Sequence, residues 1–152
     1  MNRRTFLATF PTTVLVTALA GCAVRLGLAD RVEVARKVVE VTDADGETTV
    51  LVERRYDPEH GPAYAGSGYE EFVDDPDDPL RVDAATGEEL SSAYASVTYG
   101  VRLCERLDAP GSCRETALFL DDFNDVTVGD VIDVRFGDET TGVVDVHERR
   151  NG

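Results

Sequence analysis

Hydrophobic and polar residues alternate with a period of two along several short stretches of the chain. The first stretch, residues 32–41, changes phase near Arg36, and the second covers residues 50–52. Such alternation predicts half-buried β-strands, and a change of phase within one strand predicts a β-bulge. The residues between the two stretches, 43–46, end in Asp-Gly, which is a strong signal for a tight turn. The sequence therefore predicts a β-hairpin here.

Five later stretches have an alternating or continuously apolar pattern that is typical of short strands. They cover residues 80–82, 97–103, 117–120, 126–136 and 144–146. A Pro-Gly pair at residues 110–111 suits the centre of a type II turn, so it is predicted to reverse the chain between two of these strands.

One short helix is predicted before the strand at residues 97–103. Thr86 is followed three residues later by Glu89, as in a capping box with Thr86 as N-cap, and Leu90 and Tyr94 continue at helical spacing. Six or seven short strands and one helix predict a mostly-β domain, either a small barrel or a sandwich. The order of elements resembles that of oligonucleotide/oligosaccharide-binding (OB) barrels, a likeness of fold that specifies no function.

The long connection over residues 57–79 is rich in Pro, Gly, Asp and Tyr. Connections of this length in a compact domain are usually functional or mobile. His60, Tyr64, Tyr69 and Phe72 are candidate binding residues, because tyrosines offer a large contact area with few rotatable bonds. The alternative is that these aromatic side chains fold the loop back onto the barrel as a lid, since buried aromatic residues more often serve packing.

The same connection contains a run of acidic residues. Asp74, Asp75, Asp77 and Asp78 are weak candidates for holding Ca²⁺, which takes six to eight oxygen ligands. The run does not match an EF-hand, and blocks of like charge are usually solvated surface. Calcium is therefore the minority hypothesis, and no other cofactor is expected.

The chain is strongly acidic. Its 152 residues include 30 acidic and 15 basic side chains, with Lys37 as the single lysine. Arg3 and Arg4 are the only charged residues before Cys22, so the remainder carries 13 basic and 30 acidic side chains, a formal charge of −17. Such a surface repels phosphate backbones, so nucleic-acid binding is not expected. Acidic residues spread evenly over a lysine-poor chain indicate adaptation to concentrated salt. The alternative is a surface for a basic partner or a divalent cation.

The first residues have the pattern of an export signal, with a short basic region, an apolar stretch and small residues before Cys22. Arg3, Arg4, Phe6 and Leu7 form an R-R-x-F-L sequence, and residues 19–22 read Leu-Ala-Gly-Cys. Together these segments resemble the signal peptides of haloarchaeal lipoproteins exported by the twin-arginine pathway. The resemblance covers only this N-terminal part.

The resemblance implies that residues 1–21 are a signal peptide removed before Cys22, whose sulfur then carries the lipid. Residues 22–31 would be a tether and residues 32–152 a single β-rich extracytoplasmic domain held to the outer face of the cell membrane. The alternative is an uncleaved anchor, because about 20 residues suffice to span a bilayer. Threonines and a proline within this stretch make it a weak membrane-spanning helix.

Cys104 and Cys113 are the two cysteines that remain after Cys22. They flank a predicted turn, which brings them within disulfide range, and an exported protein can keep such a bond. A metal-thiolate or redox pair would require closer C-x-x-C spacing, so a structural disulfide is predicted.

No catalytic pattern stands out. His60 and His147, the two histidines, lie far apart in the sequence, and His147 is predicted to face solvent. No nucleophile motif, phosphate loop or dinucleotide fingerprint is present. The sequence favours a non-enzymatic, lipid-anchored binding or accessory module for a protein or envelope partner. The alternative is a small hydrolase that uses a metal or the loop carboxylates with His60.

Overall fold

The computed structural model describes residues 27–147, which fold into seven β-strands and two α-helices with two short 3₁₀ helices. In chain order the elements are β1 (Asp30–Thr42), β2 (Thr48–Asp57), β3 (Gly61–Ala65), η1 (Gly68–Glu71), α2 (Ala84–Ala93), β4 (Ser96–Cys104), η2 (Pro110–Ser112), β5 (Cys113–Leu118), α3 (Leu120–Asp125), β6 (Val131–Arg135) and β7 (Thr140–Val146). β1 thus begins slightly before residue 32, where the domain was expected to start. The export motif, the lipobox and Cys22 lie outside the described residues.

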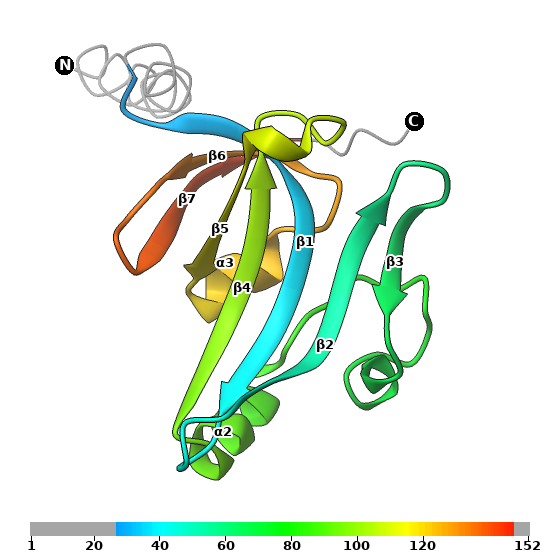
Figure 1. The fold of residues 1–152 in the computed structure, drawn as a ribbon, viewed down its shortest axis with the longest axis vertical. Helices are drawn as coiled ribbons and strands as arrows, with labels where there is room; N and C mark the ends of the chain where they lie inside the picture. Colours follow the sequence, from blue (N-terminus) through cyan, green and yellow to red (C-terminus); the bar gives the residue numbers. More distant parts are fainter. Residues whose placement is uncertain (1–26, 148–152) are drawn as a thin grey trace, which may run out of the picture.

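Five strands close into a barrel in the order β1, β4, β5, β7, β6 and back to β1. All neighbouring strands in this ring are antiparallel except β5 and β7, which are parallel. Helix α3 connects β5 to β6 and lies against the barrel (Figure 1). A five-stranded closed ring with this strand order and a helix at this point has the connectivity of an OB barrel. The prediction of a small, mostly-β barrel is confirmed.

The long strand β1 makes the closure possible. Its first residues pair with β6, and the rest of the strand pairs with β4. The pairing with β4 changes register between Val34 and Arg36, which confirms the predicted bulge. A bulge bends a strand and increases its twist, so one strand can serve both sides of the barrel. β1 is visibly curved in Figure 1.

The segment between β1 and β4 is a large insertion into the barrel. It contains β2 and β3, which extend the sheet beyond β1, followed by η1 and α2 (Figure 1). The predicted hairpin is confirmed: β1 and β2 are joined across a turn in which Gly46 has a positive φ of 86°. The predicted short helix is confirmed as α2, whereas β3, η1 and α3 were not predicted.

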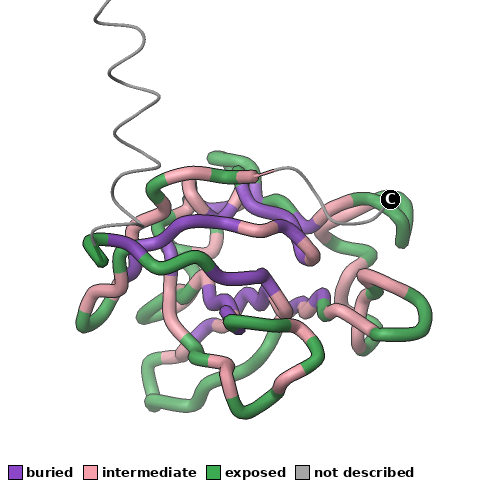
Figure 2. The backbone as a smooth tube through the Cα atoms, turned by 90° about the horizontal axis from the view of Figure 1, so that it is seen from above, coloured by how far each residue is buried: buried purple, intermediate pink, exposed green. Residues whose placement is uncertain are grey.

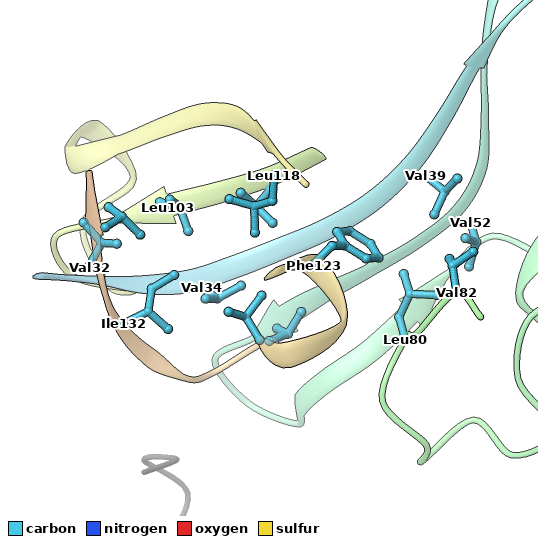
Figure 3. Close-up of a cluster of buried hydrophobic side chains, with 14 residues drawn as sticks. Val32, Val34, Val39, Val52, Leu80, Val82, Leu103, Leu118, Phe123 and Ile132 are labelled. Atoms are coloured by element: carbon cyan, nitrogen blue, oxygen red, sulfur yellow. The ribbon is translucent and has the colours of Figure 1, made fainter. Parts of the chain in front are cut away.

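The core lies inside the barrel and extends under the insertion. Figure 2 shows the buried residues along the strands in the middle of the molecule and the exposed ones along the outer loops. In Figure 3, Phe123 of α3 lies between a group of side chains at one end of the core and a second group under the insertion. The buried core residues are Val32, Val34, Val39, Val52, Leu80, Val82, Val101, Leu103, Leu118, Phe123, Val126, Val128, Ile132 and Val134.

Residues 80–82, which were predicted to be a strand, are not in one, but Leu80 and Val82 are fully buried. The side chain of Asn124 takes the place of a neighbouring strand. Its Oδ1 accepts from the Val82 backbone N–H at 2.8 Å, and its Nδ2 donates to the Val82 carbonyl at 2.7 Å. An amide side chain offers the same donor and acceptor as a peptide unit. The backbone N–H and carbonyl of Val82 therefore both have hydrogen-bond partners although no strand lies beside them.

Several local features differ from the sequence predictions, and the strand predicted at residues 126–136 is confined to Val131–Arg135. Asp83, not Thr86, is the N-cap of α2, and its carboxylate accepts from the Thr86 N–H at 2.7 Å. These hydrogen bonds hold the pKa of Asp83 below its usual range. Residues 110–111 begin the 3₁₀ helix η2 instead of forming a type II turn. The strand predicted at residues 117–120 ends at Leu118, because the chain turns into α3.

Lys37, the single lysine, is 1 % exposed at the base of this core. Its Nζ donates to the carbonyl oxygens of Leu80 at 2.6 Å, Phe123 at 2.5 Å and Val126 at 2.7 Å, and it lies 4.1 Å from the centre of the Phe123 ring. Burial, together with the positive charge of Arg81, lowers the pKa of Lys37 to about 7. The three carbonyl acceptors match the three donors of an ammonium group.

The substitution Lys37→Met is expected to lower the free energy of unfolding by about 3 kcal/mol or more, since it leaves three buried carbonyl groups without a donor. The measurement is urea unfolding followed by circular dichroism at one fixed salt concentration. Arg135→Met, an equal replacement at an exposed position of β6, is the control and should change stability by less than about 0.5 kcal/mol. A loss below 1 kcal/mol for Lys37→Met would contradict this role.

Candidate functional site

The aromatic residues of the 57–79 connection pack onto the barrel. Tyr64 and Tyr69 stack with ring centres 5.0 Å apart, and the guanidinium of Arg54 lies 4.6 Å from the Tyr64 ring. The Tyr64 hydroxyl donates to the Asp78 carbonyl at 2.8 Å, and Tyr64, Tyr69 and Phe72 all contact the core. These contacts are those of a lid, the alternative noted above, and binding by these residues stays a prediction.

His60 lies at the tip of the β2–β3 hairpin, where its side chain is 75 % exposed. Its Nδ1 is 3.6 Å from the carboxylate of Asp57, and Glu59 lies close enough for the three side chains to share a cation. The Asp57 carboxylate already accepts from the backbone N–H groups of Glu59 and His60, which lowers its pKa. This arrangement is accounted for by the hairpin turn, in which Asp side chains commonly bind the following backbone.

The acidic run at residues 74–78 is also accounted for by a turn in which an Asp residue binds the backbone that follows it. Asp75 accepts from the Asp77 N–H at 2.8 Å through its side chain and from the Asp78 N–H at 3.0 Å through its carbonyl. Two groups of three metal-capable side chains occur within residues 27–147, and Asp74, Asp75, Asp77 and Asp78 belong to neither. The structure therefore does not gather these aspartates into a ligand set.

The second such group consists of Asp133, Asp145 and His147 at the β6–β7 end of the barrel. Asp133 is completely buried and accepts from Arg31 Nε at 2.8 Å, while His147 Nε2 lies 2.9 Å from its other oxygen. Burial would raise the pKa of Asp133, but the hydrogen bonds from Arg31 and His147 outweigh it and hold the pKa below its usual range. Arg31 already supplies a positive charge to the Asp133 carboxylate. We therefore interpret the contacts of Asp133 with Arg31 and His147 as structural. His147 is half-buried, so the prediction that it faces solvent was wrong.

A cleft of about 450 Å³ opens on the outer face of β1, β2, β4 and β5. Arg55, Arg36 and Arg102 form one transverse row across it, because Arg36 pairs with Arg55 of β2 on one side and with Arg102 of β4 on the other. Directly opposed residues on adjacent strands have Cβ atoms about 4.5–5.5 Å apart. These three residues are called the arginine row below. Glu115 of β5, opposite Arg102, continues it.

The positive charges of the arginine row are only partly compensated. A single oxygen of Glu53 accepts from Arg36 Nε at 2.6 Å and from Arg55 Nη2 at 2.9 Å. Glu115 reaches Arg36 at 3.4 Å, but its side chain is 69 % exposed. Arg102 is half-buried and forms no side-chain hydrogen bond or ion pair with any other residue of the described chain. Like charges directly opposed on neighbouring strands are destabilising, so the arginine row lowers the stability of the fold.

The other wall of the cleft is mainly apolar. It is formed by Tyr56, Leu107, Pro110 and the disulfide between Cys104 and Cys113. The disulfide confirms the predicted pairing; the two cysteines lie opposite each other at the end of the β4–β5 pair. The loop after β4 is held over the cleft by the Glu33 carboxylate, which accepts from the Leu107 N–H at 2.7 Å.

The arginine row was missed by the sequence analysis, because its members are far apart in the sequence and belong to three strands. The alternation of each strand indicates that its arginine faces outward. The alignment of the three arginines in one row, however, depends on the register of β1 with both β2 and β4. That register includes a bulge immediately before Arg36. A shift of one residue would move Arg36 to the other face.

No protein-family model, curated protein or solved structure was found that matches the chain. The chain is therefore placed by its architecture alone, as a small mostly-β barrel with OB connectivity. In OB barrels the face of the second and third strands carries ligands. The second and third barrel strands here are β4 and β5, and the cleft lies on this face. Among the described helices, none is long and apolar enough to cross a membrane.

Two substitutions in the cleft should affect stability in opposite ways. Glu53→Gln is expected to lower the free energy of unfolding by about 1 kcal/mol, because it removes the carboxylate shared by Arg36 and Arg55. Arg102→Gln is expected to leave stability unchanged or raise it by about 0.5 kcal/mol, because it removes one of three adjacent positive charges. Urea unfolding at low salt measures both. A loss above 1 kcal/mol for Arg102→Gln would identify Arg102 as a structural residue.

Proposed function

We propose that this protein is a lipid-anchored, extracytoplasmic binding or accessory module, adapted to high salt, which binds a protein or envelope component in the cleft of the arginine row. The observation that carries the proposal is Arg102, which forms no side-chain hydrogen bond or ion pair among the described residues and lies beside two further arginines in a cleft on the outside of the barrel. Charged groups arranged at a cost to the free protein are typical of binding sites, since a ligand of opposite charge relieves the cost.

Anchoring is the second part of the proposal and rests on the sequence. The twin-arginine motif at Arg3 and Arg4 and the lipobox ending at Cys22 would export the folded chain and attach lipid to it. A single acyl chain binds membranes weakly, so stable anchoring requires more than one. The chain from Cys22 to Asp30 spans at most about 28 Å when fully extended, so the anchored barrel would stay near the membrane surface.

A binding role explains the chemistry of the cleft better than the hydrolase alternative. Hydrolysis by two carboxylates requires one carboxyl group that is held protonated and a second that is ionised. The carboxylate of Glu53 is already engaged by Arg36 and Arg55, and the side chain of Glu115 is largely exposed to solvent. The arginines can bind and orient an anion, but a guanidinium group stays protonated near neutral pH and so cannot act as a general base.

Anchoring is tested by fractionation of cells that express the full chain. Cys22→Ser is expected to move the protein from the membrane fraction to the soluble extracellular fraction or to leave it uncleaved. Replacement of Arg3 and Arg4 by lysines is expected to keep it inside the cell. The chain offers a matched control, since Arg149 and Arg150 form a second arginine pair whose replacement by lysines should change nothing. Unchanged export without Arg3 and Arg4 would refute the twin-arginine assignment.

Binding is tested by chemical cross-linking of intact cells in their native salt, followed by mass spectrometry of the joined species. One recurrent protein or envelope component is expected at near-stoichiometric yield, and Arg102→Gln should reduce that yield at least tenfold. Arg114→Gln is the control, because Arg114 lies on β5 beside Glu115 but stacks on Phe136 outside the cleft. Equal yields from the two variants would show that the cleft is not the contact surface.

A further inference from the structure

We infer that the ligand group of this cleft is a single carboxylate attached to an apolar body, with the carboxylate on Arg102 and the body against the wall of Tyr56, Leu107 and the disulfide. The inference rests on the proposed function and names its ligand class. The shared chemistry has two sources, a small acid component of the envelope or the carboxyl end of a protein or peptide, which the experiment separates.

The free donors of the arginine row determine where the carboxylate binds. Nε and Nη1 of Arg36 are used by Glu53 and Glu115, and Nη2 of Arg55 is used by Glu53. Within the described residues, none of the five N–H donors of Arg102 takes part in a hydrogen bond or an ion pair. A planar guanidinium binds a carboxylate through two parallel hydrogen bonds, the geometry for which arginine is best suited.

The carboxylate of Glu115 occupies part of the positive charge that a ligand carboxylate would use. Glu115 lies directly opposite Arg102 in the β4–β5 register, yet its carboxylate is turned to Arg36 at 3.4 Å and is largely exposed. An exposed ion pair of this length contributes little to stability, so it is easily displaced. A ligand carboxylate that settles on Arg102 would compete with Glu115 for the positive charge of the row.

The charge balance of the cleft favours a ligand with one negative group. The cleft side chains comprise three arginines and two glutamates, a formal excess of one positive charge. A single carboxylate neutralises this excess, whereas a polyanion would find no further positive charge among the cleft side chains. The cleft volume of about 450 Å³ lies in the range of roughly 300–1,000 Å³ typical of small-ligand sites.

The apolar wall supplies the second half of the recognition. Tyr56, Leu107, Pro110 and the Cys104–Cys113 disulfide offer carbon and sulfur surface next to the arginines. Ligand sites typically combine such surface with a few placed polar groups that fix the orientation. A bare carboxylate would leave this wall in contact with water, so the attached body is expected to contribute to the affinity.

The test is isothermal titration of the full-length protein in detergent, at one fixed salt concentration, with N-acetylphenylalanine, its amide and acetate. N-Acetylphenylalanine is expected to bind, whereas its amide and acetate bind at least tenfold more weakly. An N-acetylated tripeptide ending in phenylalanine with a free carboxylate separates the sources. Tighter binding of the tripeptide identifies a peptide end, and weaker binding identifies a free acid.

Variants locate the site. Arg102→Gln should weaken the binding of N-acetylphenylalanine at least tenfold, Glu115→Gln should strengthen it a few fold by removing the competing carboxylate, and Arg114→Gln should leave it unchanged. The inference is overturned if the amide binds as well as the acid, if none of the acids binds, or if Arg102→Gln and Arg114→Gln behave alike. If cross-linking in cells depends on Arg102 while the acids fail to bind, the ligand class is wrong and the proposed function stands.

Discussion

The buried side chain of Lys37 makes the interaction on which the rest of the structure depends. Its three hydrogen bonds tie β1 to the end of α3 and to the segment at residues 80–82, which enters the core without a strand partner. The carbonyl groups at the end of a helix carry partial negative charge, so a cation there is favourable. Without it three buried carbonyl groups would be left without a donor, and the insertion would lose one of its attachments to the core.

Lys37 and Arg36 are neighbours in one strand, and the alternation of β1 sends them to opposite faces. Lys37 therefore fixes the position of β1 from inside, while Arg36 carries the centre of the cleft outside. Anything that secures the register of β1 for stability also secures the alignment of Arg55, Arg36 and Arg102. The binding face is thereby built on paired strands, where side chains are held more firmly than on loops.

The sequence predicted the elements whose signals are local. The hairpin, the bulge near Arg36, the disulfide and the mostly-β barrel follow from alternation, turn residues and cysteine spacing. It failed where a distant partner decides the outcome: residues 80–82 are held by Asn124, and Leu120 joins a helix although it continues an apolar run. The arginine row lies in the same class, since no local signal marks which outward-facing residues become neighbours across three strands.

The acidic surface and the arginine row work at different ranges. Repulsion between the domain and a distant anion is long-ranged, and molar salt reduces it because the Debye length falls to about 3 Å. The paired hydrogen bonds of a guanidinium with a carboxylate act at contact and are screened much less. In concentrated salt an anion could therefore approach this acidic protein and be recognised by Arg102, whereas at low salt the same surface would slow its approach. Salt would thus speed the approach of an anion to this cleft, whereas it weakens nucleic-acid binding at a basic surface.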